Sequence, residues 1–199
     1  MLFAAASAIH GAQQASVAEK RTVSASELPQ PGDASHALVL ELVSFRGTRW
    51  NTESIVSAVR TAAPILGACG VALERVELRV LDAPRALHFY FTPVSRALLR
   101  EMKVSKPAIF FVEDTHNTPA FDAEAIGRAN ASTRPELADT IWIAYGSRDL
   151  AHVIAHELVH VLSDSGGHSD EPGNLMAEET SAASAHLSGR AVRQNTRDG

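Results

Sequence analysis

Residues 150–176 read LAHVIAHELVHVLSDSGGHSDEPGNLM, and the first half of this stretch has apolar residues at helical spacing. An α-helix advances about 100° per residue, so His156 and His160, four positions apart, lie one turn above each other on one face. The apolar residues form a separate stripe, made of Leu150, Val153, Ile154, Leu158, Val161 and Leu162. The helix can therefore bury its aliphatic side chains and still present two imidazoles to a cleft, where they can hold one metal ion.

A third ligand is needed after this helix. Catalytic zinc sites use three protein ligands and keep the fourth position for water. Gly166 and Gly167 follow the helix, and glycine tolerates the positive φ angles at which helices end. We therefore expect the helix to stop near Ser165 and the glycine pair to swing His168 back to the metal. Carboxylate oxygen also binds zinc, so three acidic residues remain as alternative third ligands: Asp170, Glu178 and Glu179.

Two further residues of the helix bear on the site. Glu157 follows His156 directly and is rotated around the helix axis from it. A carboxylate in that position is better placed to take a proton from water at the metal than to bind the metal, so we predict that Glu157 is the general base. His152 lies eight residues before His160 and is turned about 80° from it, so we do not count it as a ligand.

The same residues resemble the metzincin clan of zinc endopeptidases, in particular matrixin-like and reprolysin-like catalytic domains. The metzincin signature joins a His-Glu-x-x-His helix, a glycine turn, a third histidine and a methionine turn below the metal. His156, Glu157 and His160 match the helical part, His168 matches the third ligand, and Met176 matches the methionine turn. The resemblance is specific over residues 156–176 and extends more generally over residues 36–195.

The match has three departures. Seven residues separate His160 from His168, where the usual pattern has five, and Ser163 stands where that pattern has a glycine. The helix must therefore run about half a turn longer before the chain turns. Metzincins often carry a tyrosine after the methionine turn that helps to stabilise the transition state, and residues 177–199 contain none.

The distribution of apolar residues along the chain predicts an α/β (α+β) domain. Strands are expected at residues 37–45, 71–81, 108–112, 125–129 and 140–144, and helices at residues 51–66, 94–102, 150–165 and 178–194. The resemblance implies a metzincin-like arrangement: a mixed, mostly parallel sheet of four or five strands with an antiparallel edge strand, an active-site helix, a methionine turn and a C-terminal helix. Peptide substrates pair with that edge strand in metzincins, which implies that Gly127, Arg128 and Ala129 line the cleft. An ordinary surface hairpin is the alternative there.

Composition limits the domain organisation and the partners. A chain of 199 residues with 45% hydrophobic residues can bury one core, and we expect a single domain over residues 36–195. Residues 1–35 are expected to form a signal-like segment and a flexible lead, which favours a secreted or periplasmic location over a cytoplasmic one. The net charge of −5 argues against nucleic-acid binding, and no segment is long enough to span a membrane. The single cysteine, Cys69, excludes an intramolecular disulfide, and no feature specifies an oligomeric state.

These features together predict a zinc-dependent endopeptidase with one catalytic Zn²⁺ ion and a protein or peptide substrate. Hydrolysis is expected to proceed through a zinc-activated water, with Glu157 as the general base. The alternative is a zinc-binding module that binds or regulates a partner without turnover. The long spacer before His168, Ser163 and the missing tyrosine favour this alternative.

Overall fold

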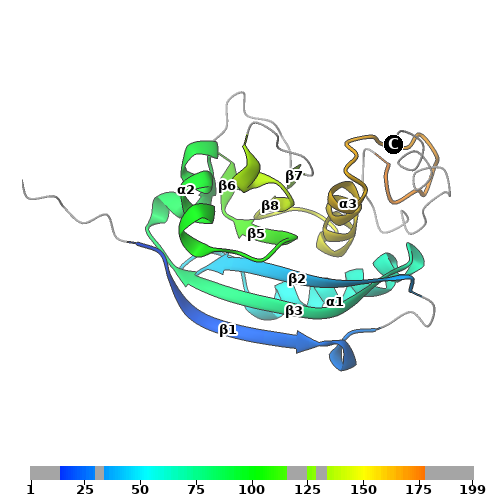
Figure 1. Ribbon diagram of the computed structural model, residues 1–199, viewed down its shortest axis with the longest axis horizontal. Coiled ribbons are helices and arrows are strands. Elements are labelled where there is room, and N and C mark those ends of the chain that lie inside the picture. Colours follow the sequence, from blue (N-terminus) through cyan, green and yellow to red (C-terminus); the bar gives the residue numbers. More distant parts are fainter. Residues whose placement is uncertain (1–13, 30–33, 116–124, 129–133, 178–199) are drawn as a thin grey trace, which may run out of the picture.

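A computed structural model describes residues 14–29, 34–115, 125–128 and 134–177 of the chain (Figure 1). Six strands form one sheet in the order β1-β3-β2-β5-β8-β7. Neighbours from β3 to β8 pair in parallel, and β1 and β7 pair antiparallel at the two edges. The strands are β1 (Ser16–Ser24), β2 (His36–Phe45), β3 (Val71–Asp82), β5 (Ala108–Val112), β7 (Ala125–Arg128) and β8 (Thr140–Ala144). The mixed, mostly parallel sheet with an antiparallel edge strand is confirmed, but it has six strands where four or five were expected, because β1 adds a second antiparallel edge strand.

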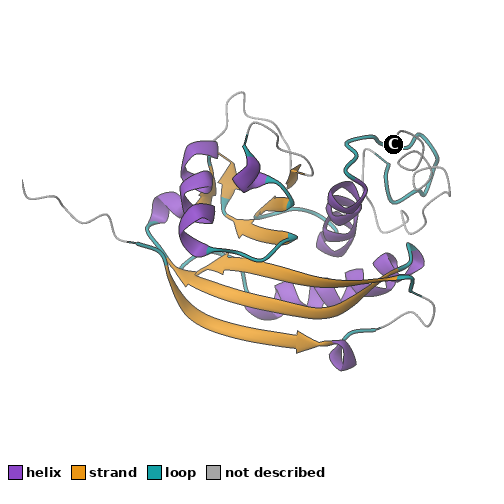
Figure 2. Ribbon diagram, viewed as in Figure 1, coloured by secondary structure: helices purple, strands orange, loops and turns teal. Residues whose placement is uncertain are grey.

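Helices cover both faces of the sheet (Figure 2). On one face α1 (Thr52–Ala68) and α3 (Leu150–Ser163) enclose the larger core, which includes Leu40 and Phe111. On the other face α2 (Thr92–Met102) covers a smaller core around Phe110 and Trp142. Phe110 and Phe111 are adjacent in β5 and fully buried on opposite faces, as expected for a central parallel strand. The continuous apolar runs of the sequence are therefore explained by a sheet that is covered on both sides.

Helix α1 begins where its sequence predicts. The side chain of Asn51 accepts hydrogen bonds from the backbone N–H groups of Glu53 at 2.8 Å and Ser54 at 3.2 Å. Such a cap satisfies donors that have no partner within the helix and stabilises it by about 1 kcal/mol. Helix α1 packs beside α3, the helix that carries two of the candidate metal ligands.

Strand β1 corrects the expectation of a flexible lead over residues 1–35. Residues 16–24 pair with β3 in an antiparallel ladder that joins Thr22 to Glu77 and Val23 to Val76. Val23 is the one residue of β1 that is classed as buried, and the other side chains are mainly exposed. The backbone hydrogen bonds to β3, rather than an apolar stripe, therefore define this strand. Residues 1–13, which carry the signal-like prediction, lie outside the described residues.

The remaining elements are short. The structure contains β4 (Phe89–Tyr90) and β6 (Asp114–Thr115), which form a separate two-stranded parallel sheet, and three 3₁₀ turns at Ala25–Glu27, Arg85–His88 and Pro135–Leu137. In the described part of the chain, no helix combines the length and the apolar character needed to cross a membrane. The C-terminal helix expected over residues 178–194 falls on residues that the structure does not describe.

Candidate metal centre

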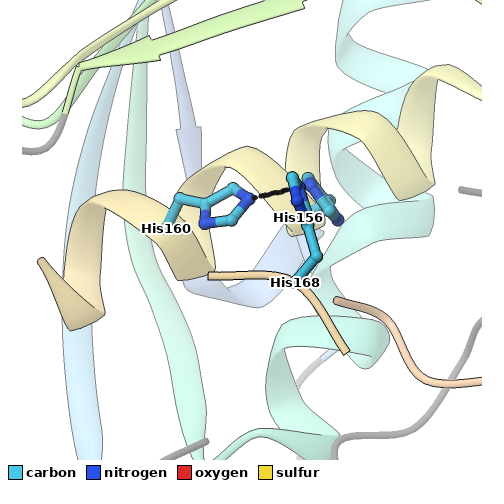
Figure 3. Close-up of side chains that lie close together, drawn as sticks. All are labelled: His156, His160 and His168. Carbon is cyan, nitrogen blue, oxygen red and sulfur yellow. Dashed lines mark hydrogen bonds between the residues drawn. The ribbon is translucent and has the colours of Figure 1, made fainter. Parts of the chain in front are cut away.

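Three imidazole rings meet beside α3 (Figure 3). His156 and His160 project from the helix, and His168 reaches them from the segment that follows it. The Nε2 atom of His160 lies 2.9 Å from Nε2 of His156 and 3.2 Å from Nε2 of His168. All three candidate ligand atoms lie within 4.8 Å of one another. The structure thus brings together the three histidines that the sequence predicts as ligands.

Hydrogen bonds on the far side of two rings define which nitrogen faces the centre. Nδ1 of His156 lies 2.8 Å from the carbonyl oxygen of Leu175, and Nδ1 of His160 lies 2.7 Å from that of Ser165. A carbonyl oxygen only accepts, so both Nδ1 atoms carry a proton and donate it. In the neutral rings the two Nε2 atoms therefore have lone pairs and no hydrogen. Two such lone pairs at 2.9 Å do not hydrogen-bond each other, but they can share a cation.

Burial keeps these two rings neutral. His156 is 5% exposed and His160 is 9% exposed. Desolvation lowers the pKa of His156 to about 4, against the hydrogen bond to the Leu175 carbonyl, and it also lowers the pKa of His160. A metal ion needs deprotonated ligands, so the site is prepared for a cation at neutral pH without first having to release protons from these rings.

The shape of the turn after α3 differs from the prediction. The helix ends at Ser163, and Asp164 adopts the left-handed conformation with φ 48°. The N–H of Asp164 bonds the carbonyls of His160 and Val161, which closes the helix. Gly166 and Gly167 do not have positive φ, so the glycine pair does not make the turn. Aspartate tolerates this backbone region better than most residues, which explains how a chain without a glycine at this place can still reverse.

Residues 164–177, which follow α3 and are called the return segment below, are held at the site by backbone hydrogen bonds. The Leu175 carbonyl binds the ring of His156, and the carbonyl of Met176 accepts the N–H of Ser169 at 2.7 Å, next to His168. Leu175 is fully buried in the larger core and Met176 is 3% exposed. The segment predicted as a methionine turn therefore connects the core to the ring of His156 and to the backbone next to His168.

The other predicted residues are placed as follows. Glu157 is half-buried on α3, next to His156. His152 is half-buried on the same helix and does not belong to the three-histidine group, as expected. Asp170 is exposed and does not belong to it either, among the residues that the structure describes. The alternatives Glu178 and Glu179 lie outside those residues.

Leu162, predicted in the apolar stripe, is instead 45% exposed, because it lies on the solvent side of the last turn.

The predicted substrate strand forms the edge of the sheet nearest to α3. Strand β7 pairs antiparallel with β8, with Gly127 opposite Ile141 and Arg128 opposite Thr140, and it contacts α3. Its other edge pairs with no strand of the described part of the chain. An edge of this kind offers N–H and C=O groups to an extended peptide. Ala129 lies outside the described residues.

Sequence reasoning did not find the groups that orient the ligands. The carbonyls of Ser165 and Leu175 are backbone atoms, which no residue type indicates in advance. Asn174, which is fully buried beside Leu175, is not among the site residues predicted from the sequence. Its place between the third histidine and the methionine was the available signal.

Comparison with known proteins adds no family. The chain matches no protein-family model, and a search of the curated proteins gives no match either. The assignment of the site therefore rests on its own geometry and chemistry.

The lowered pKa values predict how acid acts on the metal-free protein. His156 has a pKa of about 4 in the folded protein against the ordinary 6.5, so the unfolded chain binds the extra proton between these values. Stability is therefore fully present above about pH 6.5 and falls as the pH drops toward 4, by up to about 3 kcal/mol from this ring.

Urea unfolding of chelator-treated protein at several pH values measures this loss. The matched variant is His156→Gln, which removes the titrating ring from the same position and should have a shallower slope between pH 6.5 and 4. Equal slopes in the two proteins would contradict the role given to the ring.

Proposed function

We propose that this protein is a zinc-dependent endopeptidase whose metal is held by His156, His160 and His168. The observation that carries the proposal is the convergence of three Nε2 atoms, two of which have their lone pairs fixed toward one point by Nδ1–H donation to backbone carbonyls. Metal-binding histidines in proteins are oriented by this kind of outer hydrogen bond.

The spacing of the nitrogens fits zinc. Zinc binds imidazole nitrogen at about 2.0–2.1 Å with tetrahedral geometry, which places two ligand nitrogens about 3.3 Å apart. The distances of 2.9 Å and 3.2 Å between Nε2 atoms are close to that separation. A set of three imidazoles with no carboxylate suits zinc better than calcium or magnesium, which prefer oxygen ligands. Three protein ligands also leave one coordination position for the reaction, as in catalytic zinc sites.

The chain's own residues supply the acid–base chemistry. Zinc in such a site acts as a Lewis acid, which lowers the pKa of water and polarises a carbonyl group. Glu157, adjacent to a ligand on the same helix, takes the proton from the attacking water and returns it to the leaving amine. The neutral rings of His156 and His160 hold their geometry through the Leu175 and Ser165 carbonyls while charge develops at the centre.

The surroundings of the site support a peptide as substrate. Strand β7 is antiparallel, lies at the sheet edge and contacts α3, which is the arrangement that the resemblance to metzincins implies. A chain bound along β7 in extended form would satisfy its backbone groups against that edge independently of sequence. Met176, which is buried and whose carbonyl bonds the backbone next to His168, matches the methionine turn of the same clan. We therefore place this domain with metzincin-like peptidases as a proposal.

A second candidate is a zinc-binding module without turnover, favoured by the lengthened spacer before His168 and by the absence of tyrosine from residues 177–199. One experiment separates the two functions. Zinc-loaded protein is incubated with a diverse peptide library, and the products are read by mass spectrometry with chelator-treated protein as the control. Zinc-dependent cleavage supports the peptidase. A stoichiometrically zinc-loaded protein that cleaves no peptide supports the binding module.

A further inference from the structure

The side chain of Asn174, in the return segment, is hydrogen-bonded at both of its amide atoms. It is fully buried, and its Oδ1 accepts the backbone N–H of Met176 at 2.9 Å. Its Nδ2 donates to Oε2 of Glu171 at 3.3 Å, and its backbone N–H donates to the Glu171 carbonyl at 3.1 Å. A buried amide is costly unless it is hydrogen-bonded, so these contacts explain how an asparagine is accommodated here.

These contacts define the path of the backbone through the methionine turn. The Asn174 carbonyl accepts the N–H of Ala177 at 3.0 Å, so the side chain and the main chain of one residue close the turn over Leu175 and Met176. This closure fixes the direction of the two carbonyl groups inside the turn. Both carbonyls accept hydrogen bonds. The Leu175 carbonyl accepts from the ring of His156, and the Met176 carbonyl accepts from the backbone N–H of Ser169, beside His168.

From this geometry we infer that Asn174 is a positioning residue for the metal: it shapes the turn that orients His156 and anchors the segment carrying His168. The inference rests on the proposed metal site and deepens it. Asn174 acts on the ligands through the Leu175 and Met176 carbonyls. Its two amide atoms have different tasks, because Oδ1 shapes the turn and Nδ2 ties the turn to Glu171.

The first test is the zinc affinity of Asn174→Ala, measured by competition with a chromogenic chelator. Loss of an outer-shell partner weakens metal binding by about 10- to 100-fold, and we expect a loss in that range. The matched control is Asn51→Ala, which removes a capping asparagine from α1, with bonds to the N–H groups of Glu53 and Ser54. It should lower the melting temperature and leave zinc affinity unchanged, which separates positioning from general destabilisation.

Exchanging the hydrogen-bond donor and acceptor between residues 174 and 171 tests the two amide atoms without removing the side chains from the turn. Asn174→Asp keeps the oxygen that accepts from Met176 but places a second carboxylate against Glu171, so we expect weaker zinc binding. The double variant Asn174→Asp with Glu171→Gln restores one donor and one acceptor with their roles exchanged. Zinc affinity should return to within about threefold of the original protein, as expected when the lost hydrogen bond is remade.

The outcomes are distinct. If the original protein and Asn174→Ala bind zinc equally tightly, the positioning role is overturned and the proposed metal site stands. Failure of the double variant to recover affinity, when it melts at the original temperature, also overturns that role. An original protein that binds no zinc overturns the proposed function, and this inference with it. Because affinity is measured without any substrate, a protein that binds zinc but cleaves nothing leaves the positioning result readable.

Discussion

Replacement of Glu157 by glutamine is expected to lower kcat/KM for a cleaved peptide by roughly 10²- to 10⁴-fold, the range usual for loss of a general acid–base group. Zinc content should stay near one ion per chain, because Glu157 is not part of the three-histidine group. Glutamine keeps the size and the hydrogen-bonding oxygen of glutamate but cannot take a proton from water near neutral pH. The variant therefore removes the proton transfer while it preserves the half-buried side chain on α3.

The measurement is initial-rate hydrolysis of a fluorogenic peptide derived from the library screen, together with zinc analysis of the same preparations. Glu101→Gln, the same chemical change at an exposed position of α2, is the matched control and should keep full activity. Hydrolysis by Glu157→Gln at the original rate would remove Glu157 from the mechanism. Zinc loss in that variant would instead make Glu157 a part of the metal site.

Most strands and helices could be predicted because burial leaves a periodic pattern. The run Ala108–Val112 is buried throughout, and its uninterrupted apolar sequence indicates a strand covered on both faces. Helix α1 has its apolar residues at helical spacing, which indicates the helix in the sequence itself. Strand β1 could not be found in this way. Its backbone pairs with β3, yet almost all of its side chains are exposed, so no alternation of apolar and polar residues marks it.

The candidate site could be predicted only where residue type and helix geometry determine it. Histidines four residues apart on a helix imply a shared face, and the pairing of His156 with His160 follows from helix geometry alone. The place of His168 depended on a turn, and the turn was assigned to the wrong residues. Asp164, not Gly166 or Gly167, has the positive φ. Residue type gives only a tendency for this conformation, and the helix end is decided by hydrogen bonds that form after the segment packs.

The hydrogen bonds that orient the ligand rings could not be predicted from residue types either. They come from backbone carbonyls of Ser165 and Leu175, and every residue has a carbonyl. Only the fold determines which carbonyl meets which ring. The sequence therefore indicates ligand chemistry well and ligand orientation poorly, and the orientation is what distinguishes a metal site from three neighbouring histidines.

Replacement of His168 by alanine is expected to weaken zinc binding by about 10³-fold. Apparent binding free energies of protein zinc sites at neutral pH are on the order of 12 kcal/mol, so one of three protein ligands contributes about 4 kcal/mol, which corresponds to that factor. His168 is the best of the three to remove, because its side chain is exposed whereas His156 and His160 are buried. Its loss leaves no cavity, so the metal-free protein should melt at an unchanged temperature.

Chelator competition measures the affinity, and a thermal melt in chelator checks the fold. His152→Ala, on the same helix but outside the three-histidine group, is the control and should bind zinc as the original protein does. Three further alanine variants examine the other acids that could supply a third ligand: Asp170, Glu178 and Glu179. We expect each to keep its zinc. If one of them loses the metal while His168→Ala retains it, the third ligand is that carboxylate, and the convergence of three imidazoles does not describe the site as it binds metal.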